Sequence, residues 1–153
     1  MSVKVRLADY YPLIREKLDQ GGTFSLTVTG QSMYPFFLSG RDQVTLSPIC
    51  GKLKKNDMPF YRRTNGKFVL HRIVKVEKDG TYTCCGDHQW WLEKGLKHEQ
   101  MIGVVTSFVR KGKRMTNKNV LYRIYSTVWT WILPCRRYIF GVQTRVRRLF
   151  KKS

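Results

Sequence analysis

The sequence KFVLHRIVKV, residues 67–76, gives the strongest strand signal in the chain. β-branched and apolar residues dominate it, and these residue types are enriched in strands. The turn sequence Asp79-Gly80 follows, and residues 81–85 then return as a second strand, as expected of a hairpin. This hairpin predicts a domain that is built mainly from β-strands.

Further elements are predicted on both sides of the hairpin. One helix is expected over residues 9–20, because Tyr10, Ile14 and Leu18 recur at helical spacing and Gly21 follows. Apolar or alternating runs predict four more strands, over residues 24–29, 44–46, 58–62 and 101–109. The expected fold class is therefore mainly β with one N-terminal helix.

The composition is that of a globular and strongly basic protein. Of 153 residues, 42% are apolar and 13% are aromatic, which excludes a disordered chain. Lys and Arg number 29 against 10 Asp and Glu, so the formal charge is +19. A surface with this charge should attract a negative partner, such as anionic lipid, nucleic acid or an acidic polypeptide.

The charge divides the chain near residue 110. Residues 110–153 contain 13 Lys and Arg and no Asp or Glu, whereas residues 1–109 hold the other 16 basic residues and all 10 acidic ones. We therefore expect a compact domain over residues 1–109 and a basic, aromatic and helical tail over residues 110–153.

The segment VLYRIYSTVWTWIL, residues 120–133, leaves two alternatives for the tail. It could dock as a helix on the protein's own core, or its Trp and Tyr side chains could lie in the plane of an anionic membrane surface. Binding of the tail to nucleic-acid phosphate is a weaker expectation. Because the sequence shows neither a signal peptide nor an apolar run of membrane-spanning length, we expect a cytoplasmic protein that could be peripheral to the membrane.

The four cysteines lack the paired spacing of a zinc site. Cys84 and Cys85 are adjacent and would hardly close a relaxed disulfide with each other. Free thiols are typical of a reducing compartment, in agreement with a cytoplasmic location. We expect neither a metal nor another cofactor.

The loop sequence GQSMYP places a serine in a turn that is rich in glycine and proline. A nucleophilic serine needs exposure on a sharp turn, with backbone N–H groups nearby that can hold an oxyanion. Gly30 permits such a turn and Pro35 sets its exit. Gln31 and Met33 flank Ser32 in this candidate oxyanion loop. The alternative is that Ser32 is an ordinary turn residue.

His71 interrupts the apolar strand and is a candidate general base, because imidazole is suited to proton transfer near neutral pH. A lone histidine in a strand could instead be structural. Lys67 and Lys75 are alternative bases on the same strand face, but each lies about 13 Å along the strand from His71. Downstream, Asp87 or, with less support, Glu93 could hold the imidazole ring, as the acid does in a Ser-His-Asp triad.

Taken in order, the segments GQSMYP, GRDQV, VLHRIV, CCGDHQ and IGVV resemble the superfamily of type I signal peptidases and self-cleaving repressor proteases of the LexA type. The resemblance covers about residues 24–109. It implies a coiled β domain and a serine endopeptidase that cleaves a leader or signal-like peptide after small residues. A histidine in place of the lysine base is similar to the endoplasmic-reticulum, archaeal and sporulation-type signal peptidases.

Within this branch, the resemblance implies that Ser32 is the nucleophile, His71 the base and Asp87 the orienting acid, with Glu93 as a second acid. Signal peptidases often carry a hydroxyl two residues before the nucleophile, where this chain has Gly30. The backbone N–H of Ser32 would then have to contribute more to oxyanion stabilisation.

A second class of function remains open from the sequence. The protein could be a non-enzymatic or LexA-like regulator that binds nucleic acid through its basic tail. The residues before the protease-like segment show no helix-turn-helix pattern, so a peptide or protein substrate is the favoured partner.

Overall fold

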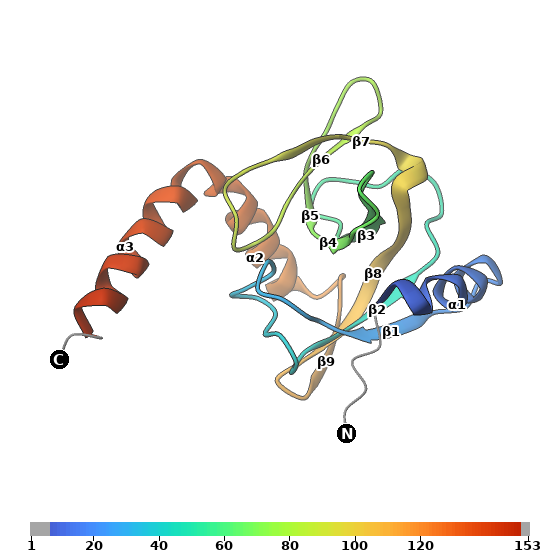
Figure 1. Ribbon diagram of the computed structural model, residues 1–153, viewed down its shortest axis with the longest axis horizontal. Coiled ribbons are helices and arrows are strands. Elements are labelled where there is room, and N and C mark those ends of the chain that lie inside the picture. The colour runs from blue at the N-terminus through green and yellow to red at the C-terminus, as the bar shows by residue number, and fades with distance from the viewer. Residues whose placement is uncertain (1–6, 151–153) are drawn as a thin grey trace.

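The computed structural model describes residues 7–150, with side chains described as far as residue 146. Antiparallel strands form two sheets, and three α-helices lie at the ends of the chain (Figure 1). The prediction of a mainly β protein with one N-terminal helix and a helical tail is confirmed. Helix α1, Leu7–Asp19, packs Ile14 and Leu18 into the core, as their spacing predicted, whereas Tyr10 of the same predicted stripe is exposed.

The first sheet has six strands and curls strongly (Figure 1). Its order is β1-β2-β8-β3-β4, and β9 also pairs with β8. The strands are β1 Phe24–Thr27, β2 Gln43–Ser47, β3 Pro59–Arg62, β4 Phe68–Leu70, β8 Met101–Arg110 and β9 Lys113–Thr116. β1 and β4 stand at the two ends of this strand order, so each presents a strand edge.

The second sheet has three strands in the order β5-β6-β7. Its strands are β5 Arg72–Val76, β6 Tyr82–Cys85 and β7 Glu93–Leu96. β5 and β6 form the predicted hairpin around Gly80. β7 was not predicted, because its sequence EKGL has little strand signal and pairs with the buried strand β6 only through the tertiary fold.

The strand predicted over residues 67–76 is two strands that belong to different sheets. β4 ends one residue before His71, and β5 begins one residue after it. Beyond His71, Arg72 and Ile73 pair with Cys85 and Cys84 of β6, so the chain enters the second sheet. Residues 71–74 are consequently all buried and do not alternate. The prediction of one continuous strand is therefore wrong.

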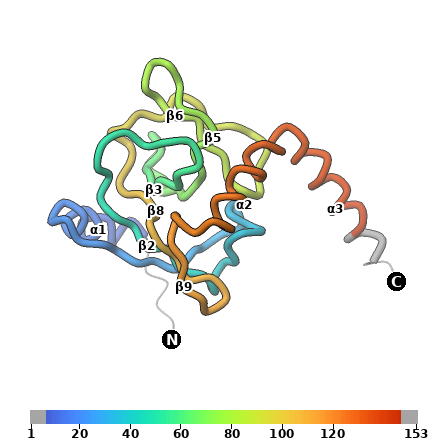
Figure 2. The backbone as a smooth tube through the Cα atoms, turned by 180° about the vertical axis from the view of Figure 1, so that it is seen from behind, coloured from blue at the N-terminus to red at the C-terminus, as the bar shows by residue number. Residues whose placement is uncertain are grey.

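The charge boundary at residue 110 does not coincide with a gap in the structure. β8 extends to Arg110, and β9 of the basic segment pairs with it in the first sheet. Helix α2, Val120–Trp131, then lies against the domain, and helix α3, Arg136–Phe150, extends away from it (Figure 2). Residues 151–153 of the predicted tail lie outside the described residues. Helix α2 packs Tyr122 into the main core, so one side of the segment 120–131 docks on the domain.

Candidate active site

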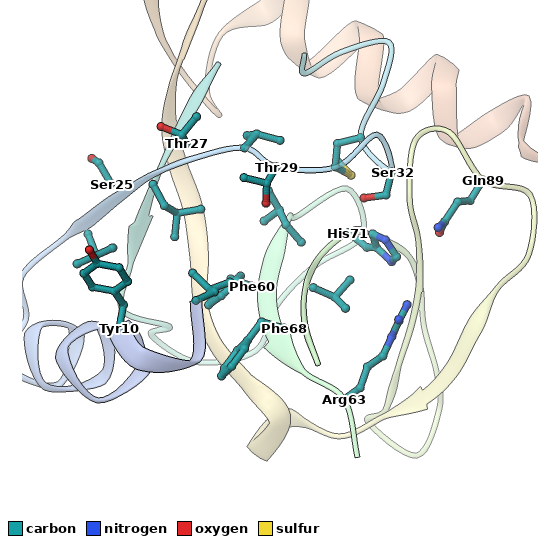
Figure 3. Close-up of a pocket in the computed structure, with 17 residues that line it drawn as sticks. Tyr10, Ser25, Thr27, Thr29, Ser32, Phe60, Arg63, Phe68, His71 and Gln89 are labelled. Atoms are coloured by element: carbon teal, nitrogen blue, oxygen red, sulfur yellow. The ribbon is translucent and has the colours of Figure 1, made fainter. Parts of the chain in front are cut away.

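A single groove contains the predicted serine and the predicted histidine (Figure 3). Its volume is about 900 Å³, and its walls come from α1, β1, β3, β4 and the loops that follow β1 and β6. Ser32, His71, Arg63 and Gln89 lie at one end of the groove, and the aromatic side chains of Phe60 and Phe68 line its middle. The edge strands β1 and β4 both contribute to this groove.

The loop that carries Ser32 is fixed by the side chains that follow the serine. Met33, Phe36 and Phe37 are buried in the main core, so the loop is anchored immediately after Ser32. Gly30 has φ of +77°, a left-handed conformation that glycine adopts without strain. Ser32 itself is half-buried, and its hydroxyl points toward the His71 ring (Figure 3). Here the GQSMYP segment forms a sharp turn, as predicted.

Two side chains contact one nitrogen of the His71 ring. The Nδ1 atom of His71 lies 3.0 Å from Oε1 of Glu93 and 3.2 Å from the hydroxyl of Tyr61. A carboxylate accepts hydrogen bonds, so Nδ1 carries the proton and Nε2 is left with its lone pair. This is the tautomer that a general base needs. His71 is only 2% exposed, which keeps the ring in one orientation.

Glu93 is held as a carboxylate by several donors. Arg63 donates from Nε to Oε2 over 2.8 Å and also pairs with Oε1 through Nη2. Burial alone would raise the pKa of the Glu93 carboxyl, but the hydrogen bonds and charges of His71 and Arg63 lower it to about 2. Burial and the nearby Glu93 charge also raise the pKa of the Tyr61 hydroxyl, so Tyr61 stays neutral. Glu93 is therefore a carboxylate at every ordinary pH, and its negative charge stabilises a protonated His71.

Asp87, the acid preferred from the sequence, pairs with a different cation. Arg72 donates from Nε to Oδ1 over 3.0 Å and from Nη2 to Oδ2 over 2.9 Å, and both side chains are completely buried. The structure thus pairs His71 with Glu93 and Asp87 with Arg72. The preference for Asp87 over Glu93 is corrected, because adjacent residues His71 and Arg72 direct their side chains to different neighbours.

The Asp87 loop nevertheless contacts the loop of Ser32. The backbone N–H of His88 donates to the carbonyl of Ser32 over 2.8 Å. A Cβ atom at Gly86 would lie 2.6 Å from the same carbonyl oxygen, so only glycine permits this approach. The Gly-Asp sequence therefore positions the candidate nucleophile, although Asp87 does not contact the histidine.

Helix α2 and the first residue of α3 hold the Asp87 loop in place. The hydroxyl of Tyr125 donates to Asp87 over 3.2 Å, and the indole N–H of Trp129 donates to the Asp87 carbonyl over 2.9 Å. The buried guanidinium of Arg136 donates to the carbonyl of Gly86 over 3.0 Å and also to that of Trp129. The basic segment is thus part of the support of the site.

Neither lysine that the sequence offered as a base lies in the groove. Lys67 is exposed, and Lys75 is exposed and pairs with Glu77 over 2.5 Å. Cys84 and Cys85 are buried, and burial raises the pKa of their thiols to about 12 and about 11, so both are protonated. Among residues 7–150, no group of three or more His, Cys, Asp or Glu side chains is placed to hold a metal ion.

Comparison with family models, with curated proteins and with solved structures finds no match for this chain. The candidate site therefore depends on its own geometry. Ser32, His71 and Glu93 are together, while Asp87 supports the serine loop from behind. Sequence reasoning missed Tyr61 and Arg63, because a tyrosine in a strand and an arginine after it give no signal until the fold places them beside His71.

Proposed function

We propose that the protein is a serine endopeptidase. The observation that carries this proposal is that Ser32 and His71 line the same end of one groove, and that Nδ1 of His71 is bound to the ionised carboxylate of Glu93. Among the described residues, no hydrogen bond joins Ser32 to His71, and in peptidases this contact tightens when substrate binds. The same three roles recur on unrelated folds, so the proposal depends on geometry and not on chain order.

In the proposed mechanism, the Nε2 atom of His71 takes the proton of the Ser32 hydroxyl as the oxygen attacks the scissile carbonyl. The Glu93 carboxylate stabilises the imidazolium that forms, and hydrogen bonds from Arg63 and Tyr61 keep that carboxylate in place. The imidazolium then protonates the leaving amine. The backbone N–H of Ser32 is the proposed oxyanion donor in the loop of Gly30, Gln31, Met33 and Pro35.

The groove favours an extended polypeptide as the substrate. β1 and β4 are the end strands of the first sheet and both line the groove, so a peptide in extended conformation could add hydrogen bonds to a strand edge. The aromatic and aliphatic lining of Phe24, Leu26, Phe60 and Phe68 suits apolar substrate side chains. This agrees with a leader or signal-like peptide, the substrate class that the resemblance implies, and with a coiled domain of the signal-peptidase and LexA type.

The decisive test is cleavage of a mixture of leader-like peptides, followed by mass spectrometry of the products. The protein should generate fragments, and Ser32→Ala should generate none while retaining its circular dichroism spectrum. Ser39→Ala is the matched control, because this serine lies in the same loop but is exposed and outside the groove. Equal cleavage by Ser32→Ala and the unmodified protein would contradict the proposal.

A further inference from the structure

Helix α2 presents a second face that no part of the described chain covers. Its buried residues Tyr122, Ser126 and Thr130 recur every four positions and pack on the domain. The opposite side consists of large apolar residues that are more than half exposed: Val120 68%, Leu121 73%, Ile124 56%, Val128 51% and Trp131 80%. Exposed apolar patches of this kind mark interaction surfaces.

Helix α3 continues this pattern with charge beside it. Tyr138, Val142 and Val146 recur every four residues and are 76%, 59% and 42% exposed. Arg137, next to Tyr138 in sequence, and Arg145, next to Val146, are also exposed on this helix. An apolar stripe beside a basic one is the pattern of helices that lie in the plane of a membrane surface. Figure 1 shows that α3 extends away from the body of the protein, which leaves its sides accessible.

The charge of the segment selects the partner. Residues 110–153 have 13 Lys and Arg without one Asp or Glu, so a second copy of this surface would be repelled and an anionic surface attracted. Nucleic-acid interfaces are polar and strongly charged, whereas Val120, Leu121, Ile124, Val128 and Trp131 give α2 an exposed apolar face. Trp131 and Tyr138 are the residue types that gather at the level of lipid headgroups. Within the described part of the chain, no helix is long and apolar enough to cross a bilayer.

We propose that the exposed apolar face of α2 and the apolar stripe of α3 form a surface that inserts in the plane of an anionic lipid bilayer. The aliphatic side chains would enter the boundary of the acyl chains, and Arg137 and Arg145 would contact the phosphate groups. This surface lies on the helix that holds the Asp87 loop against Ser32, so membrane binding would bring the groove to the bilayer. The proposal does not depend on peptidase activity.

The test is co-sedimentation of the full chain with vesicles. One set contains phosphatidylcholine and phosphatidylglycerol, and the other contains phosphatidylcholine alone. The protein should bind the anionic vesicles and bind less as salt is added. Ile124→Asp and Val128→Asp should each weaken binding about tenfold. Replacing Arg137 or Arg145 with Gln should weaken it about fivefold per residue.

Leu13→Asp is the matched control, because Leu13 is also a half-exposed aliphatic residue on a helix, and it should retain binding. Circular dichroism and thermal unfolding establish that each variant folds, and size-exclusion chromatography reports self-association. The proposal is overturned if the unmodified protein does not bind the anionic vesicles, or if the Ile124→Asp and Val128→Asp variants bind them as well as the unmodified protein does. It is equally overturned if these changes abolish only dimerisation, or only binding to a DNA duplex.

Discussion

Arg72, the first residue of β5, and Asp87 form a completely buried ion pair with two hydrogen bonds. Both side chains also form hydrogen bonds with helix α2. The remaining guanidinium nitrogen of Arg72 donates to the hydroxyls of Tyr122 and Ser126, at 2.9 and 2.8 Å. His71, which directly precedes Arg72 in the chain, lines the groove instead. Asp87 is therefore the partner of Arg72, and the orienting of His71, for which the sequence favoured Asp87, falls to Glu93.

Asp87→Asn should make the protein less stable, because it leaves the Arg72 charge buried without its charged partner. We expect the free energy of unfolding to fall by about 3 kcal/mol, measured by urea denaturation. Asp79→Asn, at an exposed turn, should cost much less. If Arg72 and Asp87 are replaced together by Met and Leu, part of the loss should be recovered, and no recovery would contradict this account.

Glu93→Gln should reduce catalysis more than stability, because it removes the negative charge that stabilises the His71 imidazolium. We expect kcat/KM to fall by about 10²- to 10⁴-fold on a cleaved peptide, with the fold retained. Glu77→Gln, which changes an acid that pairs with an exposed lysine, is the control. A larger loss of activity for a folded Asp87→Asn variant than for Glu93→Gln would restore Asp87 to the role of orienting acid.

His71→Ala should reduce kcat/KM by about 10²-fold or more, because among the described residues that line the groove with Ser32 there is no second imidazole, and no amine or carboxylate. Lys67→Ala and Lys75→Ala should change it little, since both lysines are exposed outside the groove. Steady-state kinetics on one peptide compares the three variants. Activity that survives in His71→Ala and disappears in Lys75→Ala would show that a lysine is the base.

Gly86→Ala should displace the loop of Ser32, because the added Cβ would lie 2.6 Å from its carbonyl oxygen and 2.8 Å from Oε1 of Gln89. Overpacking of this kind costs about 1–3 kcal/mol, and we expect peptide cleavage to fall with it. Gly141→Ala is the control, since a Cβ there meets nothing within 4 Å. Full activity in Gly86→Ala would show that the contact does not position the nucleophile.

Acid should destabilise the protein through two carboxyls whose folded pKa is about 2, Glu93 and Asp42. Burial of Asp42 opposes this shift, but hydrogen bonds from Arg41 and from the N–H groups of Leu38 and Lys111 outweigh it. Because both pKa values lie below those of the unfolded chain, their stabilisation is complete above about pH 5 and is lost as the pH falls toward 2. Asp42 contributes about 2 kcal/mol and Glu93 about 3 kcal/mol, so urea denaturation from pH 5 to pH 2 should show the loss. Asp42→Asn should reduce that dependence, and an unchanged slope would exclude Asp42 as a source.

The sequence by itself determined the fold class and the order of the candidate groups. Alternating and β-branched runs report local preference, which is why most strands and the helix α1 could be predicted, and GQSMYP drew attention to Ser32 through its glycine and proline. The absence of acids after residue 109 likewise predicted a basic segment, and the apolar run 120–133 predicted a helix within it. These properties depend on neighbours in the chain.

Only the tertiary structure decided which acid meets His71. A period-two pattern assumes one flat strand, but the chain changes sheet at His71, so two adjacent side chains face different surroundings and select Glu93 and Asp87 separately. Tyr61 and Arg63 join the site because β3 and β7 converge there across 30 residues of sequence. Helix α2 docks on the domain through a buried guanidinium that belongs to β5. Contacts between distant segments depend on sheet topology, which local propensity does not encode.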